Sequence, residues 1–244
     1  MVKAWRRISL SAKRRTVQLG SLVLLNSSLA AEAKWLCMPV LNCHSCQLAW
    51  FACPIGVLVH YAGLHILPFF AIGTVLLLGV LGGRILCGWV CPFGFLQDML
   101  YKIPGPKVHL PRWTSLGKYV VLALTVLLLP FLLGAETLLS FCRFCPASAI
   151  QVTGPRLAEV GAEAFSGMTV LKLALLGIVL VGVILSSRAF CRVLCPIGAM
   201  LAPLNYVSLW KIRPPTDHCR RCVTCREACP QEGRPGDRIA AGIA

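Results

Sequence analysis

The cysteines near the end of the chain have the spacing of iron–sulfur ligands. They are Cys219, Cys222, Cys225 and Cys229, in the pattern C-x2-C-x2-C-x3-C followed by Pro230. In two-cluster bacterial ferredoxins, three cysteines of such a run bind one [4Fe-4S] cluster and the fourth binds its neighbour. The sequence holds no second run of this kind. Other cysteines must therefore complete a second cluster, or this run forms one self-contained cluster.

Two further pairs of cysteines share the pattern C-x3-C-P-x-G. They are Cys87/Cys91 and Cys191/Cys195, and each pair follows an arginine and precedes an amphipathic stretch. This recurrence indicates an internal repeat. The two pairs and the terminal run together supply eight thiolates, which is enough for two [4Fe-4S] clusters. We expect each cluster to mix loop and terminal cysteines, although the spacing does not determine the pairing.

The remaining six cysteines lie in two other segments: Cys37, Cys43, Cys46, Cys53, Cys142 and Cys145. The close pairs Cys43/Cys46 and Cys142/Cys145 could form disulfides in an oxidising compartment. Alternatively, these four could bind a third metal centre. Cys37 and Cys53 have no assigned role at this stage.

Composition predicts that the chain lies in a membrane. It is 57% hydrophobic and only 14% charged, with a mean hydropathy of +0.75. A helix needs about 20 apolar residues to cross a bilayer. Four segments approach this length: 16–31, 69–86, 118–134 and 168–187. The first could instead be a cleaved signal peptide, and 55–67 is expected to form an interfacial or re-entrant helix.

Basic residues predict the orientation of these spans. Twenty Lys and Arg residues lie in segments 1–15, 84–118 and 188–244, against three in segments 32–68 and 135–167. Cytoplasmic loops carry such an excess, so both termini are expected in the cytoplasm of a bacterial inner membrane. The net charge of +15 then reflects topology, and no nucleic-acid partner is expected.

The expected fold is an all-α membrane protein with four transmembrane helices in two pseudo-repeats. A basic cytoplasmic tail spans 1–15, the first membrane repeat 16–103 and the second 104–212. A short ferredoxin-like cytoplasmic segment, 213–244, would follow. Each repeat would contain outer cysteines, a span and an inner C-x3-C-P unit.

Several phrases resemble a family of polytopic membrane iron–sulfur proteins that includes NapH, NosR and MauN. They include "CHSCQLAWFACPIG", "CGWVCPFGFLQDMLYKIPGPK", "FCRFCPA" and "FCRVLCPIGAMLAPLNYVSLWKIR". In size the chain is most similar to the NapH-like members, although such proteins commonly carry two consecutive ferredoxin runs. The resemblance implies four spans, cytoplasmic clusters and electron transfer from the quinol pool toward periplasmic partners.

The expected function is therefore that of an electron-transfer subunit with two [4Fe-4S] clusters. It would pass electrons between quinone or quinol and a partner oxidoreductase, with a periplasmic ferredoxin or cytochrome as a further candidate partner. No acid–base pair or Ser-His-Asp arrangement marks a stand-alone catalyst. The alternative is a redox-sensing or maturation protein that serves a periplasmic metalloenzyme.

Overall fold

A computed structural model describes residues 10–27, 34, 36–43, 45–46, 48–108, 110–161 and 166–210. These residues are mostly helical, with no strand and a single isolated bridge between Cys37 and Ala52. The predicted all-α class is confirmed for this part of the chain. The predicted ferredoxin segment, with Cys219, Cys222, Cys225 and Cys229, lies outside the described residues.

In the described part of the first half, one helix precedes the outer cysteines and four follow them. Their bounds are α2 Leu10–Leu25, α3 Pro54–Gly63, α4 Phe69–Gly82, α5 Ile85–Trp89 and α6 Pro92–Leu100. The first helix of the second half is continuous but changes its hydrogen-bonding pattern along its length. Its parts are η2 Arg112–Leu116, α7 Gly117–Val121, η3 Leu122–Leu128 and α8 Leu129–Leu133.

The rest of the second half contains the other outer cysteines, a long helix and two helices around Cys191 and Cys195. Around the outer cysteines lie α9 Phe141–Phe144, α10 Pro146–Ser148, η4 Ala149–Thr153 and α11 Gly154–Val160. The remaining helices are α12 Gly167–Leu185, α13 Ala189–Val193 and α14 Pro196–Val207.

Two of the described helices are long and apolar enough to cross a membrane. They are Trp113–Leu133 and Gly167–Leu185, with only 17% and 6% of their apolar windows buried. Their apolar side chains therefore face outward, as lipid contact requires. They match two of the four predicted spans. The helices at the other two positions, α2 and α4, have 16 and 14 residues and fall short of the length of a straight span.

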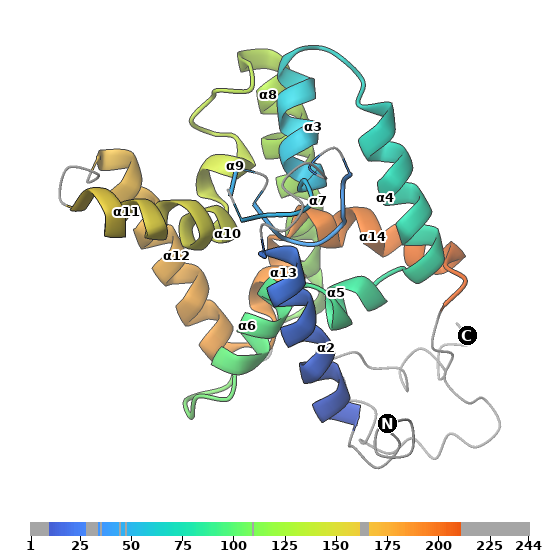
Figure 1. Cartoon of the computed structure of the whole chain (residues 1–244), viewed down its shortest axis with the longest axis vertical. Coiled ribbons are helices and arrows are strands. Elements are labelled where there is room, and N and C mark those ends of the chain that lie inside the picture. Colours follow the sequence, from blue (N-terminus) through green and yellow to red (C-terminus); the bar gives the residue numbers. More distant parts are fainter. Residues whose placement is uncertain are drawn as a thin grey trace.

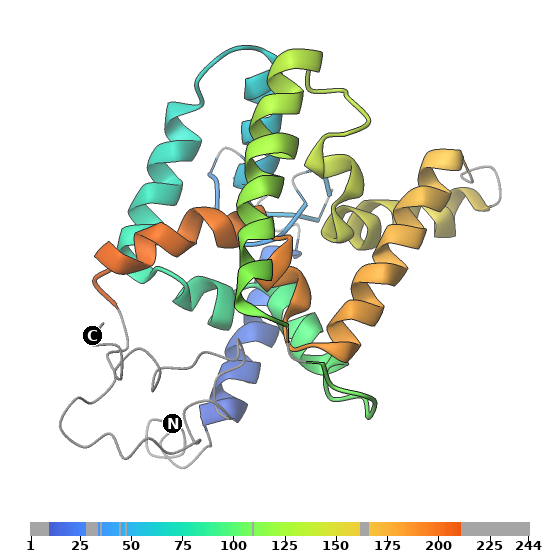
Figure 2. The same ribbon diagram turned by 180° about the vertical axis from the view of Figure 1, so that it is seen from behind.

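Local backbone features explain where the short helices end. Gly83 has a φ of 49°, and this conformation stops α4 before the predicted end of the span. The helix expected between 55 and 67 is present as α3, which begins at Pro54. It packs against η3 and α8, and both views show these helices side by side (Figures 1 and 2).

The cysteine-bearing segment 36–53 runs through the middle of the molecule. Figures 1 and 2 both show this blue trace surrounded by helices from the two halves of the chain. Val40, Leu41, Asn42 and Ala49 are almost completely buried there. The segment predicted to lie on the outer side thus reaches the core that contains Cys91 and Cys195.

Close helix packing positions the two inner cysteine units. Helix α14 lies against α4, where Gly79 allows contact with Leu204 because it has no side chain. Helix α6 packs against α2 on one side and α12 on another. Together, these contacts bring the C-x3-C-P unit of each repeat toward that of the other.

Candidate functional site

The two C-x3-C-P units have the same local structure. Cys87 lies in the short helix α5, and Cys91 is the N-cap of α6. Cys191 and Cys195 occupy the corresponding places in α13 and at the start of α14. Proline at the first helical position suits these starts, since it has no N–H that would lack a partner there. The prediction that each unit heads a helix is confirmed.

The glycine of each motif is required by close backbone approach. A Cβ on Gly94 would lie 2.9 Å from the carbonyl oxygen of Cys87. A Cβ on Gly198 would lie 3.3 Å from the carbonyl oxygen of Cys191. In both units the glycine therefore lets the second helix pass close to the first cysteine. This explains why the motif continues as C-P-x-G.

The structure brings the four inner cysteines, Cys87, Cys91, Cys191 and Cys195, into one group, here called the inner quartet. Cys87 lies near enough to Cys91 and Cys191 that a negative charge on either one raises the pKa of Cys87. Cys195 similarly interacts with Cys191 and Cys87. Between the two units, Phe93 and Phe190 pack edge to face with ring centroids 5.0 Å apart. One pair of cysteines thus comes from each repeat.

Several N–H groups point at the sulfurs of the inner quartet. The backbone N–H groups of Leu41, Gly94 and Phe93 lower the pKa of Cys91 against the larger effect of burial. The N–H of Gly198 has the same effect on Cys195. The side-chain Nε2 of Gln97 lies 2.9 Å from Cys191 Sγ. Donors of this kind stabilise negative charge on thiolate ligands.

Burial controls the protonation of these thiols. Burial, with smaller contributions from the neighbouring Cys91 and Cys191, raises the pKa of Cys87 to about 12. The Cys195 thiol hydrogen-bonds to Cys191, which lowers the pKa of Cys191 to about 7 and raises that of Cys195. Most of the group is therefore neutral without a metal, so metal binding must release protons.

A buried ion pair joins the two units beside the quartet. The Arg188 Nε and Nη2 atoms donate to the two carboxylate oxygens of Asp98 at 2.8 and 2.7 Å. Arg188 Nη1 also donates to the Cys87 carbonyl oxygen at 3.3 Å. Arg14 in α2 donates to the same carboxylate at 2.7 Å. Arg188 is 1% exposed, so Asp98 neutralises a charge that water cannot reach.

Helix α2 holds the loop between the first two quartet cysteines. Gln18 Nε2 donates to the Gly88 carbonyl oxygen at 2.9 Å, and Ser21 Oγ donates to that of Val90 at 2.7 Å. These residues and Arg14 lie on one helical face. The segment predicted to begin a span at residue 16 thus begins its helix at Leu10 and directs polar groups at the site.

The four thiols of the inner quartet are the type of donor set that binds a [4Fe-4S] cluster. The described ranges contain no group of three His, Cys, Asp or Glu side chains placed to hold a single metal ion such as zinc. The four thiols and their N–H donors therefore fit a [4Fe-4S] cluster.

Four of the other six cysteines also gather in the structure. Cys53 interacts electrostatically with Cys43, and Cys142 interacts with both of them. Cys145 in turn interacts with Cys53 and Cys142. This group includes Cys53, which had no predicted role, in place of Cys46. All ten described cysteines are free thiols, so the disulfides considered as one alternative for Cys43/Cys46 and Cys142/Cys145 are not present.

A motif in the sequence could have identified Cys53. The run Cys53-Pro54-Ile55-Gly56 repeats the C-P-x-G pattern of the inner units. Cys53 is the N-cap of α3, with φ −72° and ψ 125°, close to the −67° and 118° of Cys91. The signal was therefore the residue pattern after the cysteine rather than the spacing between cysteines.

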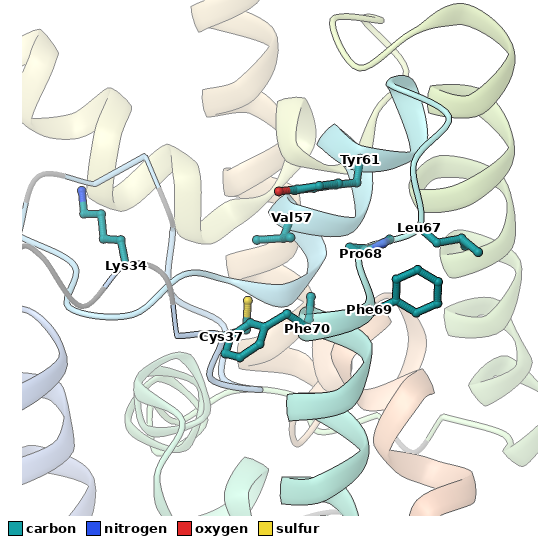
Figure 3. Close-up of a pocket in the computed structure, with 9 residues that line it drawn as sticks. Lys34, Cys37, Val57, Tyr61, Leu67, Pro68, Phe69 and Phe70 are labelled. Atoms are coloured by element: carbon teal, nitrogen blue, oxygen red, sulfur yellow. The ribbon is translucent and has the colours of Figure 1, made fainter.

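A cavity of about 290 Å³ lies between α3 and the start of α4. Its lining is mainly apolar, with Lys34 and Tyr61 as polar groups and Cys37, Phe69 and Phe70 among the others. Figure 3 shows Tyr61 projecting from α3 with its hydroxyl toward the Cys37 side, whereas Leu67 and Phe69 lie at the other end. A flat, polar-edged ring could occupy such a space.

Comparison with known proteins agrees with this geometry. A family profile described as a 4Fe-4S binding domain matches residues 64–111 and again residues 168–215. Each match contains one C-x3-C-P unit. The chain is homologous to ferredoxin-type 4Fe-4S proteins. This homology supports an electron-transfer role, and the doubled match agrees with the internal repeat predicted from sequence.

Three relatives illustrate the homology. The methylamine utilization ferredoxin-type protein MauN of Methylobacillus flagellatus is 28% identical over 66% of this chain and 54% of its own length. The ferredoxin-type protein NapH of Haemophilus influenzae is 26% identical over 64% of this chain and 51% of its own. The regulatory protein NosR of Pseudomonas aeruginosa is 29% identical over 66% of this chain and 22% of its own.

The chain spans about half the length of MauN and NapH. No solved structure matches it.

Proposed function

We propose that the protein is a membrane-bound iron–sulfur subunit that passes electrons between the quinone pool and a partner oxidoreductase. The meeting of Cys87, Cys91, Cys191 and Cys195 carries this proposal, because it creates a four-thiolate site from two units that separately match a 4Fe-4S domain. A [4Fe-4S] cluster held by these four cysteines would supply single-electron transfer. The surrounding residues orient the thiolates and exclude water.

The inner quartet holds one complete cluster in this proposal. The terminal run, with Cys219, Cys222, Cys225 and Cys229, then holds a cluster of its own. This assignment differs from the prediction that each cluster mixes loop and terminal cysteines, which falls on residues outside the described ranges. Its support is the mutual proximity of the loop cysteines, since Cys87 interacts directly with Cys191 of the other repeat.

The two arrangements predict different iron losses. With separate clusters, the double variant Cys87→Ser/Cys191→Ser loses about four irons per chain, and Cys222→Ser loses a different four. The losses then add when the variants are combined. If the clusters are mixed, replacements in the loops alone also perturb the spectrum of the terminal cluster. Iron and labile-sulfide analysis of anaerobically purified protein separates these outcomes.

The cavity between α3 and α4 is the proposed quinone site. Phe69 and Phe70 offer aromatic surface for the ring. Lys34 and Tyr61 offer donors for its oxygens. The two apolar helices Trp113–Leu133 and Gly167–Leu185 would place the protein in the membrane that contains this substrate.

Reduction by a short-chain quinol tests the electron-transfer proposal. In the wild type we expect rapid anaerobic reduction of the clusters, which is monitored through their absorbance. Tyr61→Phe should slow it several-fold, because one hydrogen bond of about 1 kcal/mol is lost. Tyr119→Phe is the matched control, since Tyr119 lies on the helix Trp113–Leu133, away from the cavity.

Clusters that dithionite reduces but quinols do not would contradict a role in the quinone pool. That result would favour the alternative of a redox-sensing or maturation protein, to which the name of the relative NosR also points.

A further inference from the structure

We propose that Cys43, Cys53, Cys142 and Cys145 form a second four-cysteine iron–sulfur site, here called the outer quartet, directly beside the inner quartet. This site goes beyond the proposed function, which needs only the inner quartet and the terminal run. It lies outside both matches to the 4Fe-4S domain, which cover residues 64–111 and 168–215.

The outer quartet repeats the construction of the inner one. Cys53 and Cys145 each cap a helix that begins with proline, Pro54 in α3 and Pro146 in α10. Their φ,ψ angles are −72°,125° and −64°,124°, against −67°,118° for Cys91. Among the described residues, four cysteine-proline helix starts therefore share one conformation, two in each quartet.

N–H groups point at the outer sulfurs as they do at the inner ones. The backbone N–H groups of Ile55 and Gly56, at the start of α3, lower the pKa of Cys53 against the larger effect of burial. Those of Ala147 and Ser148, at the start of α10, do the same for Cys145. This arrangement is suited to thiolate ligands.

A polar network fixes the loop that brings Cys43 to the group. Gln151, in η4, accepts a hydrogen bond from the Cys43 backbone N–H at 2.7 Å. Its Nε2 atom donates to the side-chain oxygens of Asn42 and Asn26. Gln151 follows Cys145 by six residues, so this network ties the two halves of the outer quartet together.

The choice of four ligands follows from the contacts. Of the pair Cys43/Cys46, it is Cys43 whose negative charge raises the pKa of both Cys53 and Cys142. Among the groups that shift the pKa of Cys53, Cys37 has the smallest effect. Cys37 also lines the cavity near Tyr61. Four cysteine thiols are the ligand set of a [4Fe-4S] cluster, and the described ranges show no group of three side chains placed to hold a single metal ion.

Leu41 connects the two quartets. Its N–H donates to Cys91 of the inner quartet, and Cys43 of the outer quartet is two residues away. Two residues of extended chain span at most about 7 Å. Electron tunnelling and magnetic coupling both weaken steeply with distance. Centres this close would exchange single electrons and would perturb each other's paramagnetic spectra.

Metal analysis of the full chain tests the site. Three [4Fe-4S] clusters require about twelve irons per chain, against about eight without the outer quartet. Cys53→Ser/Cys145→Ser should lose about four irons and the spin-coupling features of the fully reduced spectrum. It should keep the uncoupled signal of the inner cluster, which also shows that the variant has folded. Cys46→Ser is the matched control and should lose no iron.

Four results would overturn the proposal. They are about eight irons in the wild type with no further loss in Cys53→Ser/Cys145→Ser, a Cys142–Cys145 disulfide in its peptide map, zinc in place of iron, or equal iron loss in Cys46→Ser and Cys43→Ser. None of these depends on the inner quartet, whose own test is the Cys87→Ser/Cys191→Ser variant.

Discussion

The first C-x3-C-P unit differs from the second in how it is held, although both have nearly the same backbone. The first unit receives hydrogen bonds from Gln18 and Ser21 of α2. It also supplies Gln97 and Asp98, which reach across to the second unit. In the second unit, Leu201 and Ala202 occupy the positions that correspond to these two residues. At these two positions the first copy of the motif therefore carries polar residues and the second copy carries apolar ones.

The asymmetry has a backbone component as well. Arg188 has φ 49° and ψ 39°, a left-handed conformation that costs a non-glycine residue about 1–2 kcal/mol. The corresponding Arg84 has φ −77° and ψ −3° and is unstrained. The left-handed turn allows Arg188 to bond to Asp98 and the Cys87 carbonyl oxygen. The repeat therefore deviates from its own symmetry where its two copies meet.

The largest expected effect comes from breaking the ion pair across this junction. Asp98→Ala would leave the Arg188 charge buried without a partner and should destabilise the protein by about 3–5 kcal/mol. Thermal unfolding in detergent measures the loss. Glu136→Ala is the control, since its carboxylate also pairs with an arginine but is 96% exposed. Equal melting temperatures for the two variants would disprove a special role for the buried pair.

A smaller effect should distinguish the two motif glycines. Gly94→Ala forces a Cβ to 2.9 Å from the Cys87 carbonyl oxygen, which is backbone and cannot easily move. We expect a cost of about 1–3 kcal/mol and partial loss of iron. In Gly198→Ala the corresponding distance is 3.3 Å, so the loss should be smaller. Paired denaturation and iron assays check this order, and a reversed order would contradict the geometry.

The smallest effect concerns electronic tuning by the first unit. Gln97→Leu installs the residue type found at the corresponding Leu201 and removes the donor to Cys191. Losing a bond of about 1 kcal/mol that favours the more negative, reduced state should lower the cluster potential by about 40 mV. Gln18→Leu serves as control because Gln18 bonds to a carbonyl oxygen. A redox titration in which both variants shift equally would contradict direct tuning by Gln97.

Sequence reasoning predicted the local structure of the inner units well. Pro92 and Pro196 begin helices, as residues after a helix-capping cysteine should. The helices Trp113–Leu133 and Gly167–Leu185 also match predicted spans, because long uninterrupted apolar runs are visible without tertiary information. In both examples, the determining interactions lie within a few residues of each other.

The grouping of the cysteines required contacts that no local pattern encodes. Cys87 and Cys191 are 104 residues apart, and their approach depends on Asp98, Arg188 and the Phe93–Phe190 contact. The burial of segment 36–53 was also missed, because its lack of Lys and Arg only placed it on the outer side of the membrane and did not reveal the helices that surround it. The start of α2 was missed because the basic residues up to Arg15 were assigned to a tail, whereas Arg14 lies within the helix and bonds to Asp98 of the first unit.

The composition of the inner quartet determines when a cofactor can be inserted during biogenesis. Two apolar helices lie between Cys91 and Cys191, so a growing chain presents the first pair of cysteines long before the second. A half-formed site would leave half of a cluster's iron atoms without protein ligands. Insertion of both helices and their packing must therefore precede cluster delivery. Only chains in which both halves are already packed can therefore bind the cluster, so cluster binding is a late step of biogenesis.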